Sequence, residues 1–319
     1  MTRDAIPLSN IAPYLRIIGR GARHAPGEQD KQDAHALSRE QAADLFAQVL
    51  DGRIGDLEMG AFCVAMRIKG ITPDEMMGFL DAAQARLARF PATRQPLVVL
   101  PSYNGARRLP VLTPLLALLV ARAGLPVLLH GCQTEAGRVP SQAVLAALDI
   151  PALTAPRLID DGEMVYADTA LLCPGLKRLL DVRQTLGQRN AGHSMVKLIQ
   201  PGSGAQIIVS SYTHGEYADV MARAFEGLGM SGMLSRGAEG ESVVDPRRTL
   251  QIDGFVRGRH RVLQARQAGE VIQDTGLPTA IDADATADYT RRALAGQAPV
   301  PAAITGQVEH ICALARALE

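Results

Sequence analysis

Residues 37–87 read LSREQAADLFAQVLDGRIGDLEMGAFCVAMRIKGITPDEMMGFLDAAQARL and carry the clearest structural signals in the chain. Ser38 stands three residues before Gln41, and Thr72 stands three residues before Glu75. Each pair matches a capping box, in which the first side chain caps the start of a helix and the second returns a hydrogen bond. Apolar residues recur at helical spacing after the first box and before the second, so the helices have apolar faces to bury. The stretch therefore predicts a compact helical bundle.

The length and composition of the chain predict a protein with a sizeable core. Its 319 residues are 47% hydrophobic, which favours two domains or one large domain with a small partner. The longest apolar run, Leu112–Leu129, is interrupted by Arg122, Gly124 and Pro126, and indicates helix, turn and strand instead of a membrane span. The first ten residues lack the basic and then apolar pattern of a signal peptide. We expect a cytoplasmic protein with no membrane partner.

The four cysteines suggest neither a zinc site nor a disulfide framework. They are far apart in the sequence and form no C-x-x-C pair. Free cysteine is among the most buried residue types, so we expect buried thiols at Cys63, Cys132, Cys173 and Cys312.

Short apolar runs alternate with helical patterns after the bundle. The expected strands are Leu97–Leu100, Leu125–Leu129, Ala170–Leu172, Gln206–Ser210 and Gly229–Leu234. The expected helices between and after them are Leu112–Ala123, Gly175–Leu186, Gly215–Gly227, Thr286–Ala295 and Ala302–Leu318. Alternation of this kind predicts an α/β fold with a mostly parallel sheet covered by helices.

The order of features in residues 37–87 resembles the opening domain of the anthranilate phosphoribosyltransferases, which belong to glycosyltransferase family 3. That domain has a D-x-x-x-x-A-F helix and then a K-G-x-T-x-x-E helix, matched here by Asp56, Ala61-Phe62, Lys69-Gly70, Thr72 and Glu75. A later family segment, V-R-x-x-L-G-x-R-T-x-x-N-x-x-G-P, is matched by Val182-Arg183, Leu186-Gly187 and Arg189.

This resemblance implies the nucleoside phosphorylase/phosphoribosyltransferase class II fold, a small helical domain plus a large α/β domain with a mostly parallel central sheet. Residues 1–90 would form the N-terminal helical domain, joined in space by helices of about residues 175–200. Residues 91–319 would form the α/β domain. An additional apolar face at Ile11, Tyr14, Leu15 and Ile18 precedes the family pattern. We interpret it as part of a homodimer surface, or as a helix that packs on its own bundle.

The diphosphate site of the family is altered in this chain. The family turn G-T-G-G-D-G, which would present backbone N–H groups to phosphate, is replaced by residues 101–106, PSYNGA, and the loop K-H-G-N-R by residues 129–133, LHGCQ. The side chain of Tyr103 either stacks on a base or fills the vacated pocket. The remnant of the phosphoribosyl pocket would be Ser102, Tyr103, Asn104, Gly105, Thr113, His130 and Gly131.

The magnesium motif of the family, D-G-x-D-E, is altered as well. It aligns with residues 239–243, EGESV, so Ser242 and Val243 replace the two metal-binding carboxylates. A shift of two residues would offer Glu239 and Glu241 instead. We predict no catalytic residues and no cofactor, with magnesium needed only if a transferase reaction survives.

Arginine is concentrated in the segments that would line the cleft of such a fold. Only four of the 33 basic residues are lysines, although the formal net charge is zero. Arginine binds phosphate through a planar fork of donors. Any single arginine is more often a solvated surface residue than a phosphate ligand. The proposed set, expected at the surface of one groove, is Arg107, Arg108, Lys177, Arg178, Arg183, Arg189, Lys197, Arg236, Arg247 and Arg248.

Residues 193–201, HSMVKLIQP, and 237–248, GAEGESVVDPRR, resemble the YbiB branch of this family, which is described as binding nucleic acids without sequence preference. That resemblance implies DNA or RNA as the partner and a homodimer as the assembly. Two alternatives remain open. One is a glycosyltransferase family 3 enzyme, similar to anthranilate phosphoribosyltransferase, that acts on a phosphoribosyl or nucleoside substrate. The other is a protein-interaction scaffold.

Overall fold

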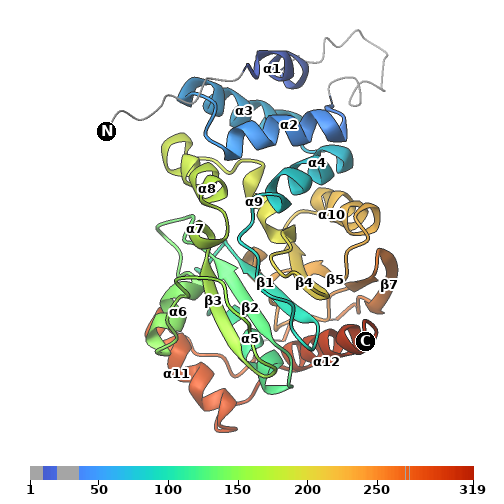
Figure 1. The fold of residues 1–319 in the computed structure, drawn as a ribbon. Helices are drawn as coiled ribbons and strands as arrows, with labels where there is room; N and C mark the ends of the chain where they lie inside the picture. The colour runs from blue at the N-terminus through green and yellow to red at the C-terminus, as the bar shows by residue number, and fades with distance from the viewer. Residues whose placement is uncertain (1–9, 20–35, 270, 273) are drawn as a thin grey trace. The chain divides into compact units, whose positions relative to one another are not determined.

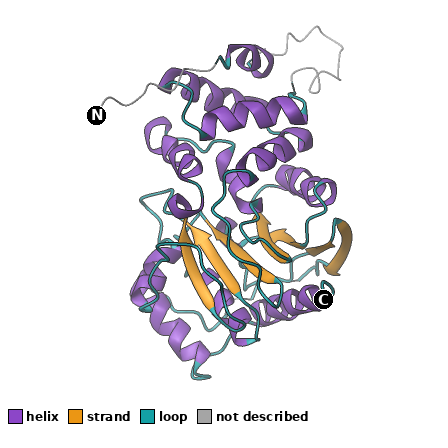
Figure 2. Ribbon diagram, in the orientation of Figure 1, coloured by secondary structure: helices purple, strands orange, loops and turns teal. Residues whose placement is uncertain are grey.

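The computed structural model describes residues 10–19, 36–269, 271–272 and 274–319 (Figure 1). The chain divides into two compact units. The helical unit contains the described residues up to Leu87 together with Cys173–Ile199, and the sheet unit contains Ala88–Leu172 and Gln200–Glu319. Figure 2 shows that all the strands belong to the sheet unit. Each unit is described by itself below.

The helical unit is built around the two predicted capping boxes, and both are confirmed. Ser38 and Gln41 start α2, and Thr72 and Glu75 start α4. The aromatic rings of Phe46 and Phe79 stack in the core with centroids 4.6 Å apart. The helices of the unit are α1 (Ala12–Ile18), α2 (Arg39–Leu50), α3 (Asp56–Lys69), α4 (Pro73–Gln84), α8 (Pro174–Leu186) and α9 (Gly192–Met195).

The short helix α1 packs on its own bundle. Its apolar side chains Ile11 and Ile18 are buried, and the Tyr14 hydroxyl donates a hydrogen bond of 2.7 Å to Asp44 on α2. Of the two interpretations of this apolar face, packing within the unit is therefore the observed one.

The sheet unit contains one seven-stranded sheet in the order β3-β2-β1-β4-β5-β6-β7. The first five strands in this order, β3, β2, β1, β4 and β5, run parallel. The pairs β5–β6 and β6–β7 are antiparallel. The strands are β1 (Leu97–Ser102), β2 (Val127–Gly131), β3 (Met164–Asp168), β4 (Gln206–Tyr212), β5 (Gly232–Arg236), β6 (Ile252–Val256) and β7 (Arg259–Gln264). The predicted α/β class with a mostly parallel sheet is confirmed.

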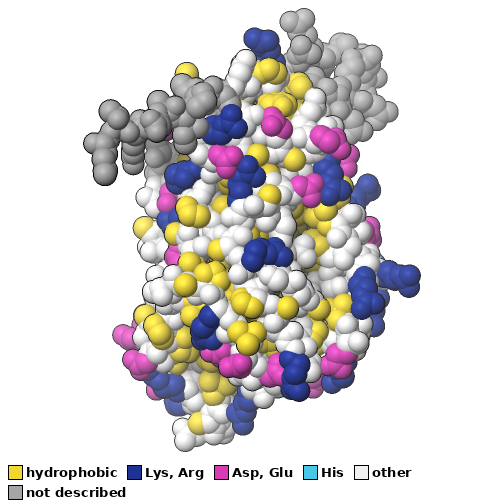
Figure 3. Space-filling model, viewed as in Figure 1, with side chains coloured by type: hydrophobic (Ala, Val, Ile, Leu, Met, Phe, Trp, Pro, Cys, Tyr) yellow, Lys and Arg dark blue, Asp and Glu magenta, His cyan; other side chains and the backbone are white. Residues whose placement is uncertain are grey.

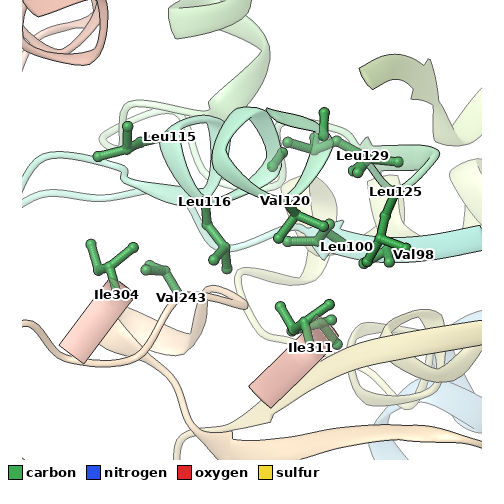
Figure 4. Close-up of a cluster of buried hydrophobic side chains, with 14 of the residues drawn as sticks. Val98, Leu100, Leu115, Leu116, Val120, Leu125, Leu129, Val243, Ile304 and Ile311 are labelled. Atoms are coloured by element: carbon green, nitrogen blue, oxygen red, sulfur yellow. The ribbon is translucent and has the colours of Figure 1, made fainter. Parts of the chain in front are cut away.

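Helices cover both faces of this sheet. Side chains of α5 and α12, including Leu116, Val120 and Ile311, pack against alternate residues of the central strands such as Val98 and Leu100 (Figure 4). On the opposite face, α10 packs through Phe225, whose ring stacks on that of Phe255 with centroids 4.6 Å apart. The helices of this unit are α5 (Thr113–Arg122), α6 (Ser141–Ala147), α7 (Thr169–Leu172), α10 (Gly215–Gly227), α11 (Ala283–Leu294) and α12 (Ala302–Arg316).

One sequence prediction about the strands is wrong, and one pair of strands was missed. Ala170–Leu172 was expected to be a strand, but the strand lies earlier, at Met164–Asp168, and Thr169–Leu172 forms the short helix α7. The apolar run was too short to fix the register. The antiparallel hairpin of β6 and β7 was not expected at all. Its turn uses Arg257 and Gly258, both with positive φ.

None of the helices in the described part of the chain combines the length with the apolar character that crossing a bilayer requires.

Candidate nucleic-acid interface

The carboxyl ends of β1 and β5 meet the loops that replace the family's diphosphate and metal motifs. In parallel α/β sheets, this edge is where ligands bind. The turn after β1 carries Asn104 and Gly105, and the loop after β5 carries Glu239 and Glu241. We call residues 238–242 the glutamate loop.

Glu241 occupies the turn where the family would hold phosphate. Its carboxylate is 2% exposed and accepts hydrogen bonds from the backbone N–H groups of Asn104 and Gly105, both at 2.8 Å. The hydroxyls of Ser102 and Thr113 donate to the same carboxylate at 2.5 and 2.9 Å. Clustered backbone N–H groups form an anion-binding site, and here the anion is a side chain of the chain itself.

Glu239 occupies the next three backbone donors. Its carboxylate accepts from the N–H groups of Arg107, Arg108 and Leu109 at 3.2, 2.8 and 3.0 Å, and pairs with the Arg138 guanidinium at 3.3 Å. Glu239 has a φ of 51°, a left-handed conformation that is uncommon for a residue other than glycine. The glutamate loop thus supplies two carboxylates where the family would bind a diphosphate.

Tyr103 fills the space between this turn and β2. Its side chain is 2% exposed, its hydroxyl lies 2.7 Å from Nδ1 of His130, and Thr169 donates to it at 3.2 Å. Burial lowers the pKa of His130 to about 3, so this imidazole is neutral at physiological pH. A buried ring at this position fills the pocket and does not stack on a base.

The structure brings the predicted remnant residues together, but their hydrogen bonds go to other groups of the protein. A side chain at Gly131 would collide with the carbonyl of Ser102, which explains the glycine there. Both carboxylates that a shifted metal motif would require, Glu239 and Glu241, are turned onto protein donors. Among the described residues, there is no group of three or more His, Cys, Asp or Glu side chains that is arranged to hold a metal ion.

A separate groove of about 830 Å³ lies within the sheet unit, at the carboxyl ends of β4 and β5. We call it the arginine groove. Five of its lining residues are arginines, namely Arg108, Arg236, Arg247, Arg248 and Arg266. Its acidic lining residues are Glu239 and Asp245.

Both acids of the arginine groove are already engaged. Glu239 is held by the backbone donors described above, and Asp245 binds Arg247 through two hydrogen bonds of 2.9 Å. No ion pair to another described residue engages the guanidinium groups of Arg108, Arg236, Arg248 and Arg266. On the face of the molecule seen in Figure 3, by contrast, basic and acidic side chains are interleaved. The groove is therefore a local concentration of cations in a chain without net charge.

An aromatic side chain also lines the arginine groove. Tyr212 ends β4 and lies in register with Arg236 at the end of β5. Its ring is partly exposed, and burial raises the pKa of its hydroxyl, so it is neutral. A neutral ring can stack on a base, and the neighbouring arginine can bind the phosphate of the same nucleotide.

The predicted cations divide between the two units. Arg107, Arg108, Arg236, Arg247 and Arg248 belong to the sheet unit, and all of them except Arg107 line the arginine groove. The other five, Lys177, Arg178, Arg183, Arg189 and Lys197, belong to the helical unit.

The cations of the helical unit serve partly structural roles. Lys177 pairs with Asp181 at 2.6 Å, and Arg178 donates to the carbonyl of Leu50 at 2.8 Å. The expectation that all of the set lies at the surface is wrong for Lys197, which is 7% exposed. Burial, followed by the charges of Arg189 and Arg183, lowers the pKa of the neighbouring His193 to about 3.

Sequence reasoning missed Arg266, Tyr212 and His214, which also line the groove. Tyr212 carried a usable signal, because it lies at the end of an apolar strand in a parallel sheet. Arg266 carried none, since it follows the hairpin that the sequence did not reveal.

Comparison with known proteins places the chain in a family. Residues 29–86 match the family model described as the glycosyl transferase family, helical bundle domain. The uncharacterized protein YbiB of Escherichia coli strain K12 is 35% identical over 309 residues, covering 94% of this chain and 92% of YbiB. The chain belongs to the YbiB branch of glycosyltransferase family 3. An anthranilate phosphoribosyltransferase of Methanopyrus kandleri is 27% identical, with 83% of this chain and 81% of that protein covered.

Solved structures agree on the fold. Anthranilate phosphoribosyltransferase from Thermus thermophilus superposes with a TM-score of 0.64 at 21% identity, covering 89% of this chain and 86% of that one. The enzyme from Saccharomyces cerevisiae in complex with PRPP and Mg gives a TM-score of 0.68 at 12% identity, with 97% and 89% covered. The predicted phosphoribosyltransferase class II fold is confirmed.

Proposed function

We propose that this chain binds DNA or RNA without sequence preference, through the arginine groove, and that it has lost the transferase chemistry of its family. The observation that carries the proposal is the groove itself, where four guanidinium groups form no ion pair with another described residue. Of the two lining carboxylates, Asp245 is bound by Arg247 and Glu239 by backbone donors. Arginine forks bind phosphate oxygens in two-point contacts that do not depend on base identity.

The glutamate loop supports the loss of transferase chemistry. A phosphoribosyl diphosphate needs the donors that Glu239 and Glu241 now occupy. A diphosphate could bind here only if it displaced the Glu241 carboxylate from its four hydrogen bonds. The exchange of one anion for another would bring no net gain in hydrogen bonds. The residues at the family's metal positions are Ser242 and Val243, and the Ser242 hydroxyl donates to the carbonyl of Pro101 at 2.5 Å.

The proposal is tested by titrating the full-length protein with single- and double-stranded DNA of unrelated sequences at two salt concentrations. Each phosphate contact on duplex DNA contributes about −0.9 to the log–log salt slope, so four contacts predict a loss on the order of 100-fold between about 50 and 200 mM salt. All sequences should bind alike. Absent binding, or affinity that does not respond to salt, would refute the proposal.

The names of the curated relatives favour a second candidate, a phosphoribosyltransferase. This candidate requires the glutamate loop to swing away and release its donors. Calorimetric titration with phosphoribosyl pyrophosphate and magnesium distinguishes the two, and we expect no binding. Growth of a tryptophan auxotroph that lacks its own anthranilate phosphoribosyltransferase, when rescued by this chain, would establish the second candidate.

A further inference from the structure

A smaller pocket opens beside the arginine groove, and we call it the end pocket. Its volume is about 140 Å³, roughly one sixth of that of the groove. The two share Leu250 and three arginines, Arg247, Arg248 and Arg266. The remaining lining residues described are uncharged, namely Thr249, Leu250, Gln267, Ala268, Gly269 and Ile272.

The frame of the end pocket is fixed by backbone hydrogen bonds. The N–H of Gln267 donates to the carbonyl of Thr249 at 3.2 Å, and the N–H of Ile272 donates to the carbonyl of Arg247 at 3.0 Å. The side chain of Gln264, at the end of β7, donates to the carbonyl of Leu250 at 2.7 Å. These bonds join the two walls to the hairpin at the edge of the sheet, so the arginines project from an ordered frame.

The electrostatics of the end pocket differ from those of the groove. Asp245 and Glu239 line the groove but not the pocket, and no carboxylate is among the pocket's described lining residues. Arg247 is paired with Asp245, whereas Arg248 and Arg266 have no such partner among the described residues. Two guanidinium groups that form no ion pair with a described residue, together with Arg247, therefore line a space of about 140 Å³.

These features select a particular kind of phosphate. A phosphodiester within a strand carries one negative charge, whereas a terminal phosphomonoester carries about −1.5 to −2 at pH 7 and offers three acceptor oxygens. The end pocket is about one sixth the size of the arginine groove that it adjoins, so it suits the end of a strand better than its interior. We propose that the end pocket binds the terminal phosphate of a nucleic-acid strand whose adjoining nucleotides lie in the arginine groove.

This inference rests on the proposed function, because the strand is held by the groove. The test uses the full-length protein and three internally labelled oligothymidylates of equal length, with a 5′-phosphate, a 3′-phosphate or hydroxyls at both ends. Fluorescence anisotropy should show about tenfold tighter binding for a phosphorylated end, equivalent to one additional charge-assisted contact of about 1.4 kcal/mol. The preference should disappear in Arg266→Gln. It should persist in Arg316→Gln, the same change at an exposed arginine on α12.

The outcomes separate the two claims. Equal binding of all three oligonucleotides to the unmodified protein overturns the inference and leaves the proposed function standing. A preference that survives in Arg266→Gln also overturns it. If no oligonucleotide binds, both claims fall. Displacement of the labelled oligonucleotide by equimolar inorganic phosphate or adenosine monophosphate would assign the pocket to free phosphomonoesters and contradict its assignment to strand ends.

Discussion

At the scale of single residues, Glu241 supplies an internal anion to the backbone donors of the turn after β1. A buried carboxylate that accepts four hydrogen bonds satisfies donors that would otherwise lack partners. The arrangement converts an anion-binding turn into part of the core. Glu241 holds two loops together across 137 positions of sequence.

We expect Glu241→Gln to lower the free energy of unfolding by about 3 kcal/mol, because an amide nitrogen cannot accept the hydrogen bonds that a carboxylate oxygen accepts. Urea denaturation measures the change. Glu226→Gln, at an exposed position on α10, is the matched control and should change stability by less than about 0.5 kcal/mol. A Glu241→Gln protein as stable as the control would mean that the glutamate loop does not fill the turn in solution.

The neutral histidine His130 predicts a pH dependence of stability. Its folded pKa of about 3 lies below the unfolded value of about 6.5, so the unfolded chain binds more protons between these values. Stability should therefore be complete above pH 6.5 and fall toward pH 3, by about 1.4 kcal/mol per pH unit for this group. In His130→Asn the unfolding free energy, measured between pH 6 and pH 4, should fall less steeply. An unchanged slope would contradict the buried neutral state.

At the scale of elements, α3 carries an apolar stripe that its own unit leaves exposed. Leu57 and Ile68 are 88% and 82% exposed, and Ala61 and Val64 lie between them at helical spacing. The helix begins with Asp56 and ends near Arg67, both of which are exposed. Two antiparallel copies of α3 would pair these opposite charges around a shared apolar seam. We propose this stripe, in place of the buried face of α1, as the homodimer surface.

The stripe is tested by changing Ile68→Arg, which would bury a charge in the apolar seam opposite Leu57 of the second copy. Size-exclusion chromatography with light scattering should then report a monomer at micromolar concentration, while the parent is a dimer. Leu158→Arg, a matched change at a 49% exposed leucine of the sheet unit, should remain dimeric. A monomeric parent, or a dimeric Ile68→Arg variant, would reject α3 as the interface.

Elements with strong local signals could be predicted from the sequence. The boxes at Ser38 and Thr72 fix helix starts because both partners lie within one turn. The hairpin of β6 and β7 could not be predicted from its turn. Two-residue turns of this kind usually have Asn or Asp before glycine, but here Arg257 takes that position, at φ 49°. Its basic edge strand also lacks a long apolar run.

The candidate site was only partly predictable for a different reason. The loss of the family's motifs could be recognised from residues 101–106 and 239–243 alone. What replaced them could not, since the hydrogen bonds of Glu239 and Glu241 join loops more than 120 residues apart. Arg266 could not be assigned to the groove either, because it follows the hairpin that the sequence does not predict. The burial of Lys197 was also not predicted.

At the scale of the whole molecule, the proposed function depends on the arginines of the groove that form no ion pair with another described residue. The chain is neutral overall, so nonspecific attraction to nucleic acid by net charge is excluded as the source of binding. The proposed binding therefore rests on the local set of arginines in the groove. Lys197→Glu is an unsuitable test, because it would bury a carboxylate and disturb folding. Exposed Arg236 and Arg248 offer a direct one.

The most direct measurement compares the salt dependence of duplex DNA binding between the parent protein and the double variant Arg236→Gln/Arg248→Gln, with Arg316→Gln as the control. Removing two phosphate contacts should reduce the magnitude of the log–log slope by about 1.8 and weaken binding to every sequence alike. The control should retain the parent slope. A folded double variant that binds with the parent's affinity and slope would contradict the assignment of nucleic-acid binding to the arginine groove.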